Sequence, residues 1–182
     1  EYDVFADAVI GEEQFTTLEN DKVEIRFTNK GGRVYSARLK DYKTHDSLPL
    51  ILFEGDEALL DFTLVTATNR VVNTAGMYFQ AIPGNDPNTL TMRLSAGDGR
   101  HLDFTYTLSK DDYMVKMDIK GTGLNGVLSP STNALDIDWE QKIRQQEKGR
   151  KFEDQYAASY YKFVADDVEC LSETKNDSKQ LS

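Results

Sequence analysis

The sequence predicts an all-β protein, built as an antiparallel sandwich with one or two short helices. Apolar and polar residues alternate along many short stretches, which is the period of a strand with one buried face. Gly, Asn, Asp and Pro separate these stretches at short intervals. Only residues 145–156 combine strong helix formers with aromatic residues at helical spacing, although Gly149 weakens this helix. Many short strands with one helix are typical of a sandwich.

A predicted hairpin organises the first part of the chain. Residues 23–27 alternate apolar and charged side chains, and residues 33–39 form the returning strand. The turn between them, Asn29-Lys30-Gly31-Gly32, contains paired glycines that readily adopt a positive φ. The side chains of this hairpin that we expect in the core are Val23, Ile25 and Phe27.

A three-stranded antiparallel meander is predicted further along, at residues 89–95, 101–108 and 113–120, because all three stretches alternate and short turns join them. Its expected core residues include Leu90, Met92, Leu94, Leu102, Phe104, Tyr106 and Leu108. In a later strand, at 135–140, Leu135, Ile137 and Trp139 are expected to face inward. The other strands are expected at residues 14–18, 50–53, 61–68, 70–72, 78–82, 159–164 and 168–171.

The length, charge and apolar content of the chain limit the classes of protein to which it can belong. A chain of 182 residues suits one domain with a real core. Its net charge of −10 disfavours a nucleic-acid surface and broad docking on anionic lipid. The longest apolar run, at about residues 48–53, is far too short to span a bilayer. The single cysteine, Cys170, excludes an intrachain disulfide and is expected to be buried apolar filler.

No catalytic, cofactor-binding or metal site is predicted. One Cys and two distant His residues provide no zinc spacing, and the turns Gly97-Asp98-Gly99 and Asp111-Asp112 do not fit a calcium loop. Gly121–Gly126 has the spacing of a dinucleotide motif but opens no helix. His45 and His101 are candidate general bases, more simply explained as exposed or satisfied histidines. Five aromatic residues either fill the core or line a shallow peptide groove: Phe152, Tyr156, Tyr160, Tyr161 and Phe163.

Several sequence stretches indicate a family resemblance that periodicity alone does not show. They are residues 18–32 (LENDKVEIRFTNKGG), residues 104–108 (FTYTL) followed by Asp112-Tyr113-Met114-Val115, and residues 145–152 (QQEKGRKF). Together they resemble the large periplasmic domain of YidC-type membrane protein insertases, in the form found in the Bacteroides group. The likeness covers about residues 14–172. It implies a β-supersandwich, related in shape to galactose mutarotase-like and carbohydrate-binding domains.

The resemblance also implies a function. The parent would be a multi-pass inner-membrane protein that inserts and folds membrane proteins, alone or with the Sec translocon. This domain would lie between its first two transmembrane helices, at the periplasmic face, without catalytic activity. The implied partners are the Sec translocon, its accessory subunits and nascent membrane proteins. No functional residue carries over, because the family's insertion groove lies among transmembrane helices.

The expected organisation is a lead-in or linker at 1–13, the periplasmic domain at 14–172, and a polar tail at 173–182 toward a helical and transmembrane region outside this sequence. Because the chain begins at Glu1 and has no signal peptide, we expect an excised piece. Two alternatives stay open at this point. One is a carbohydrate-binding or mutarotase-like sandwich, which would need His45 or His101 to meet carboxylates in a cleft. The other is an adhesin-like surface domain.

Overall fold

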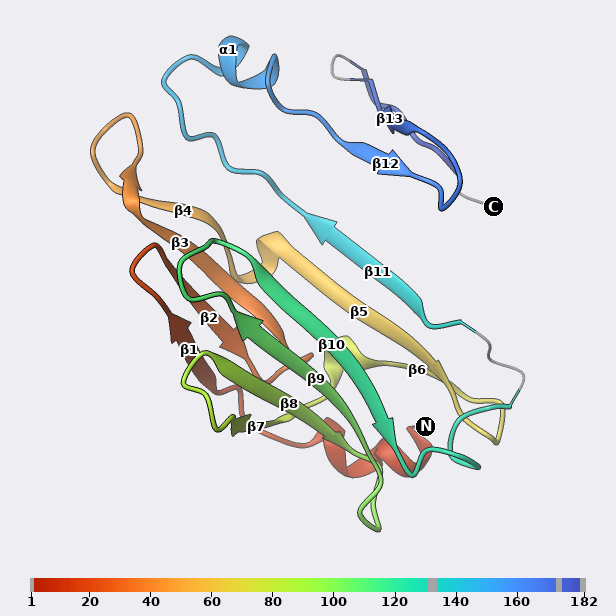
Figure 1. The fold of residues 1–182 in the computed structure, drawn as a ribbon. Helices are drawn as coiled ribbons and strands as arrows, with labels where there is room; N and C mark the ends of the chain where they lie inside the picture. The colour runs from red at the N-terminus through yellow and green to blue at the C-terminus, as the bar shows by residue number, and fades with distance from the viewer. Residues whose placement is uncertain (1, 131–133, 173–174, 181–182) are drawn as a thin grey trace. The chain divides into compact units, whose positions relative to one another are not determined.

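The computed structural model describes residues 2–130, 134–172 and 175–180, which divide into two compact units. The first unit is Glu1–Lys43 with Pro49–Ile143, and the second is Thr44–Leu48 with Arg144–Ser182. Strands β1 to β11 belong to the first unit, and α1, β12 and β13 belong to the second (Figure 1). Every pairing between named strands is antiparallel. The predicted all-β antiparallel architecture is therefore confirmed.

The first sheet has the strand order β1-β2-β3-β4. Its strands are β1 (Phe15–Glu19), β2 (Val23–Thr28), β3 (Arg33–Lys43) and β4 (Pro49–Glu54). The predicted hairpin is β2 with β3, and its turn uses positive φ at Gly31 (77°) and Gly32 (61°). A side chain at position 32 would also meet the Phe79 ring, since an added Cβ would lie 2.8 Å from Phe79 Cδ1. The three core residues predicted on β2 are buried, as expected.

The second sheet is the predicted meander, extended by one strand to the order β10-β9-β8-β7. Its strands are β7 (Gln80–Pro83), β8 (Thr89–Ser95), β9 (His101–Leu108) and β10 (Val115–Thr122). The seven residues predicted to line its inner face are all at most 5% exposed. On the outer face, Arg93 binds Asp103 through two hydrogen bonds of 2.8 Å.

The third sheet has the order β11-β5-β6. Its strands are β5 (Ala58–Val65), β6 (Val71–Asn73) and β11 (Asp136–Gln141), and the 3-10 segments η2 (Gly55–Glu57) and η3 (Thr74–Gly76) lie beside β5 and β6 in sequence. The buried carboxylate of Asp61 on β5 accepts hydrogen bonds from Asn73 Nδ2 (2.7 Å) and Ala75 N (2.9 Å). This bonding fixes η3 against β5.

Aromatic contacts show how the three sheets of the first unit share one core. Tyr106 on β9 packs against Phe27 on β2, with ring centroids 4.8 Å apart. Phe104 on the same strand packs against Phe62 on β5 at 4.8 Å. The inner face of the second sheet is therefore one layer, and the first and third sheets together form the layer opposite it. This arrangement is a sandwich, as predicted.

Residues 3–9 differ from the featureless lead-in that the sequence predicts. They form the 3-10 segment η1 (Asp3–Val9), in which Phe5 is completely buried in the core. The backbone of Ala8 also accepts a hydrogen bond from Tyr78 N (2.6 Å). An acidic stretch without obvious period can thus dock through one aromatic anchor. The proposed domain boundaries of 1–13, 14–172 and 173–182 stay a prediction.

In the second unit the predicted helix at 145–156 is wrong in extent. Helix α1 covers only Arg150–Asp154, because Gly149 takes an extended N-cap conformation (φ −105°, ψ 92°). The Glu153 carboxylate then accepts a hydrogen bond from Gln146 N (2.8 Å), which holds residue 146 outside the helix. The remaining elements are β12 (Tyr160–Lys162) and β13 (Val168–Cys170), which pair only with each other among the described strands.

Candidate functional site

An apolar groove of about 360 Å³ lies in the first unit, at the edge where β10 and β11 end their sheets. Side chains from β3, β4, β5, β9, β10 and β11 form its walls and floor. The lining residues are Arg33, Val34, Phe53, Ala58, Leu59, Leu60, Tyr106, Val115, Met117, Trp139 and Gln141. Most of these residues are aliphatic or aromatic, so the groove suits an apolar ligand surface.

The floor of the groove is continuous with the core. Phe53, Leu60 and Met117 are partly buried and pack against the core cluster. Tyr106 beneath them is 2% exposed. Because these side chains are held by the packed sandwich, the floor is a rigid surface rather than one assembled from loops.

Two strand edges flank the groove. Both β10 and β11 stand at the end of their sheets, so each has one hydrogen-bonded neighbour among the described strands. The outer edge of such a strand presents unpaired N–H and C=O groups. The groove therefore combines an apolar floor with backbone groups that are free to pair with another strand.

The strand register shows which side chains face the groove. Met117 lies opposite Tyr106 on the inner face of its sheet. Trp139 lies opposite Leu60, and Ile137 lies opposite Phe62, whose ring is in the core. Trp139 and Ile137 are thus on the core-facing side of the third sheet.

Ile137 and Trp139 face inward, as predicted, but neither side chain is buried. Trp139 is 74% exposed and Ile137 is 58% exposed. All six residues of β11 are exposed, although its partner β5 is largely covered. The reason is that the opposing sheet ends at β10, so none of the described residues of the first unit covers this part of the inner face.

The polar atoms at the groove are bound to backbone carbonyls. The Tyr106 hydroxyl donates to the carbonyl oxygen of Gly32 (2.7 Å), and burial raises the pKa of this phenol far above its ordinary value. Arg33 Nη1 donates to the carbonyl oxygens of Val34 (3.1 Å) and Gly55 (3.2 Å). These bonds satisfy the Tyr106 hydroxyl and the Nη1 donor of Arg33, and the apolar side chains are left to meet a ligand.

Neither of the two predicted candidate bases is among the lining residues of this groove. His101 is on β9, where its Nδ1 is 2.9 Å from the carbonyl oxygen of Gly99 and its Nε2 is 3.5 Å from Asp103 Oδ2. His45 belongs to the second unit, where its backbone N–H donates to the carbonyl oxygen of Gln146 (3.2 Å). The groove lining, as described, includes no His, Cys, Asp or Glu.

The acidic turns and the glycine motif have structural explanations. Asp98 pairs with Arg100 (2.9 Å), and Asp112 accepts a hydrogen bond from Tyr113 N (2.7 Å). The segment 121–126 ends β10 and turns, with positive φ at Gly123 and Gly126. Within the described residues no group of three or more His, Cys, Asp or Glu side chains could hold a metal ion. No described helix is long and apolar enough to cross a membrane.

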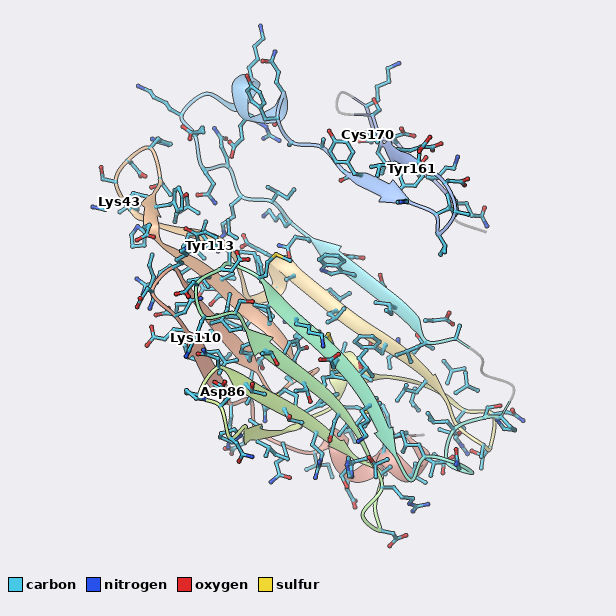
Figure 2. The ribbon with its side chains drawn as sticks, in the orientation of Figure 1. Lys43, Asp86, Lys110, Tyr113, Tyr161 and Cys170 are labelled. Carbon is cyan, nitrogen blue, oxygen red and sulfur yellow. The ribbon has the colours of Figure 1, made fainter. Side chains whose placement is uncertain are left out.

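The second unit holds a shallow hollow beside α1 but little apolar packing. Its lining residues are Glu147, Lys148, Gly149, Glu153, Tyr156 and Ala157. The expectation that the aromatic residues here fill a core is wrong for Tyr156 and Tyr160, which are exposed; the side chain of Phe152 lies outside the described part. Cys170 is also exposed rather than buried (Figure 2). The hollow lies beside a five-residue helix, and none of the described residues of this unit is among the buried core residues, so we regard the groove as the candidate.

The comparisons with known proteins place the chain in a family. The family model described as the YidC periplasmic domain matches residues 16–181. The chain belongs to the YidC periplasmic domain family. A protein of Parabacteroides distasonis named membrane protein insertase YidC is 64% identical over 180 residues, 99% of this chain and 28% of that protein. Proteins with the same name from Azobacteroides pseudotrichonymphae (45% identical; 99% of this chain and 29% of that protein) and Bacteroides fragilis (44%; 98% and 29%) are also similar. No solved structure gives a significant match.

The resemblance predicted from the sequence is therefore confirmed, including its likeness to the Bacteroides group. The chain spans less than a third of the length of these curated relatives.

Sequence reasoning missed the groove of this YidC periplasmic domain. Its lining residues come from six strands spread between Arg33 and Gln141, so no local motif marks it. One signal was available: the only tryptophan lies on a strand whose other face carries Asp136, Asp138 and Glu140.

Proposed function

We propose that this chain is a non-catalytic, polypeptide-binding part of a membrane protein insertase at the periplasmic face of the inner membrane. The name shared by its relatives supports the insertase assignment. The Sec translocon, its accessory subunits and nascent membrane proteins are the partners that we propose for the parent protein. The carbohydrate alternative gains no support from the groove, whose described lining lacks the histidine and carboxylates it requires.

The observation that carries this proposal is the apolar groove between two open strand edges. An extended polypeptide can add to a sheet edge through main-chain hydrogen bonds while its alternate side chains enter pockets. The edges of β10 and β11 offer the hydrogen bonds, and the floor between them offers the pocket. Trp139 at the rim is the residue type that most often dominates binding energy at interfaces.

Peptide titration of the purified 182-residue chain tests this proposal. Trp139 is the only tryptophan, so its emission reports on the groove without a label. An extended peptide with alternating apolar residues is expected to shift this emission to shorter wavelength and to saturate. A polar peptide of the same length is expected to do neither.

Two variants of β10 provide the matched comparison. Met117→Glu places a charge in the groove, and Thr122→Glu places the same charge on the opposite face of the strand. We expect Met117→Glu to weaken peptide binding at least tenfold, because the carboxylate would be desolvated by the ligand. Thr122→Glu should change it less than twofold. Equal binding by both variants, or no emission shift at all, would overturn the proposal.

A further inference from the structure

Two exposed tyrosines pack together in the first unit, and neither is among the lining residues of the groove. Tyr42, near the end of β3, is 51% exposed, and Tyr113, just before β10, is 37% exposed. Their ring centroids are 6.3 Å apart, and Met114, the next residue in sequence, is 65% exposed. Tyrosine and methionine are enriched at protein interfaces. We call these three residues the tyrosine patch; Figure 2 labels Tyr113.

The turn that carries Tyr113 is held in place by one side chain. Asn20, in the turn between β1 and β2, donates through Nδ2 to the carbonyl oxygens of Ser109 (2.7 Å) and Asp112 (2.8 Å). Its Oδ1 accepts a hydrogen bond from Val23 N (2.8 Å), which fixes the amide itself. A surface that is already ordered loses little conformational entropy on binding. The patch therefore has the rigidity of a binding surface.

The immediate surroundings of the patch favour a cation. Desolvation, a hydrogen bond with Tyr42 and the charges of two carboxylates raise the pKa of the Tyr113 phenol. The carboxylates belong to Asp41 and Asp112, so the electrostatic field at this phenol is negative. One ammonium group is already present, because Lys22 Nζ lies 5.5 Å from the centroid of the Tyr113 ring. The face of an aromatic ring attracts cations through its quadrupole.

The negative charge extends over the neighbouring turns. Figure 2 shows Asp86 and Lys110 at the same end of the first unit as Tyr113. The turns and strand ends that gather there are residues 20–22, 41–43, 84–88 and 109–114. They contain three lysines and a larger set of aspartates: Asp21, Asp41, Asp86, Asp111 and Asp112. Because the whole chain also carries a net charge of −10, this end attracts and orients a basic segment.

We propose that the tyrosine patch is a docking surface for an arginine-bearing segment of a second protein. A guanidinium group of that segment stacks on the exposed ring of Tyr42 and donates hydrogen bonds to the neighbouring carboxylates. Arginine suits this place because its planar cation combines ring stacking with paired hydrogen bonds to a carboxylate. The inference goes beyond the proposed function, because the groove takes apolar side chains and its described lining contains no Asp or Glu. The two surfaces therefore select partners of different chemistry.

Fluorescence polarisation of the 182-residue chain with labelled peptides tests this inference. The probe peptide alternates Arg with Gly, and its control replaces each Arg by citrulline, which keeps the shape of the side chain and removes its charge. At about 0.15 M salt, where long-range attraction is screened, we expect saturable binding of the Arg peptide. The citrulline peptide should bind about tenfold more weakly. Equal binding of both peptides, or binding of neither, overturns the inference.

Substitutions separate the patch from general attraction by the acidic chain. Tyr42→Ala should weaken binding of the Arg peptide about tenfold, whereas Tyr42→Phe keeps the ring and should stay within about threefold. Tyr156→Ala, at an exposed tyrosine of the second unit, is the control and should stay within about twofold. Asp41→Asn should weaken binding about fivefold, and Asp138→Asn less than about twofold. All four positions are exposed, so the fold is kept. Equal effects of Tyr42→Ala and Tyr156→Ala overturn the inference.

Photo-crosslinking in a full-length protein that contains this chain identifies what covers the patch in cells. A benzophenone amino acid replaces Tyr42, and mass spectrometry locates the crosslinked residue. A crosslink beside an Arg of a second protein, lost when Asp41→Asn is added, supports the inference. A crosslink to lipid, to a second copy of this chain or within the same chain overturns it. A crosslink that Asp41→Asn leaves unchanged, or no crosslink at all, also overturns it.

Discussion

Removing the hydroxyl of Tyr106 tests how the core is joined to the β2–β3 turn. This hydroxyl donates a buried hydrogen bond of 2.7 Å to the carbonyl oxygen of Gly32. A buried hydrogen bond contributes about 1 kcal/mol, and a buried carbonyl left without its donor costs about 1–3 kcal/mol. We therefore expect Tyr106→Phe to lower the free energy of unfolding by about 2 kcal/mol. The ring is unchanged, so packing against Phe27 is kept.

The stability difference between the original protein and Tyr106→Phe should also depend on pH. Burial raises the pKa of Tyr106, so the folded protein favours the neutral phenol. The stability from this group is complete below the unfolded-state pKa of about 10 and is lost as pH rises above it, at up to about 1.4 kcal/mol per pH unit. Tyr106→Phe has no phenol to ionise. The stability difference between the two proteins should therefore narrow by about 1 kcal/mol between pH 9 and pH 11.

Urea unfolding followed by far-UV circular dichroism measures both effects. Tyr35→Phe is the matched control, because the Tyr35 hydroxyl makes no hydrogen bond among the described residues; we expect it to stay within about 0.5 kcal/mol of the original protein. Two results would refute the reasoning. One is a Tyr106→Phe protein as stable as the control at neutral pH, and the other is a stability difference that does not narrow in alkali.

Three further predictions concern other parts of the chain. Phe104→Ala should lower the free energy of unfolding by about 3–5 kcal/mol in urea titrations, because the ring is fully buried. Asn20→Ala should cost about 1–2 kcal/mol and speed amide exchange in residues 109–113, because its Nδ2 binds two carbonyl oxygens there (2.7 and 2.8 Å). The Tyr161 hydroxyl donates a hydrogen bond to Glu169, and this bond raises the pKa of Tyr161 to about 12. Absorbance titration of Glu169→Gln should show the pKa of Tyr161 nearer the usual tyrosine value of about 10.

Each of these predictions has a contradicting result. A loss below about 1 kcal/mol for Phe104→Ala would mean that the core repacks around the missing ring. Unchanged amide exchange in Asn20→Ala would mean that the Asn20 side chain does not hold residues 109–113 in place. A titration curve that is identical in Glu169→Gln and the original protein would mean that the carboxylate does not accept the bond in solution.

The strands of the meander could be predicted from the sequence almost residue by residue. Strands β8 and β9 have the predicted bounds, because each has one face of large apolar residues and one polar face. Gly and Asp residues mark the turn between them. In such a strand the local pattern and the final burial agree, so periodicity suffices.

Strand β11 shows where periodicity stops being enough. Alternation correctly identified the core-facing side of Trp139 but could not tell whether another layer covers that side. The same limit explains Cys170, which lies on a short strand whose three residues are all exposed. For the helix, Gly149 was the available signal, because glycine has a low helix propensity and the helix begins only after it.

The candidate site was beyond prediction for a different reason. Each apolar residue of the groove has the local pattern of a core residue of its own strand. The groove exists because β10 and β11 end two different layers at the same edge. That coincidence depends on how whole sheets pack, which no window of the sequence records.

The pairing of β5 with β11 also has a consequence for how the chain folds. The sheets β1-β2-β3-β4 and β7-β8-β9-β10 join strands that follow one another, so each can form soon after its residues become available. Strand β5 pairs with β6 at once, but its other edge must wait for β11: Ala58 pairs with Gln141 across the whole intervening meander. Closing so long a loop comes late, because its entropy is lost before the contacts form. During synthesis the β5 edge therefore stays open after the rest of the sandwich has assembled, and that interval is when the unit is most prone to pair with the wrong chain.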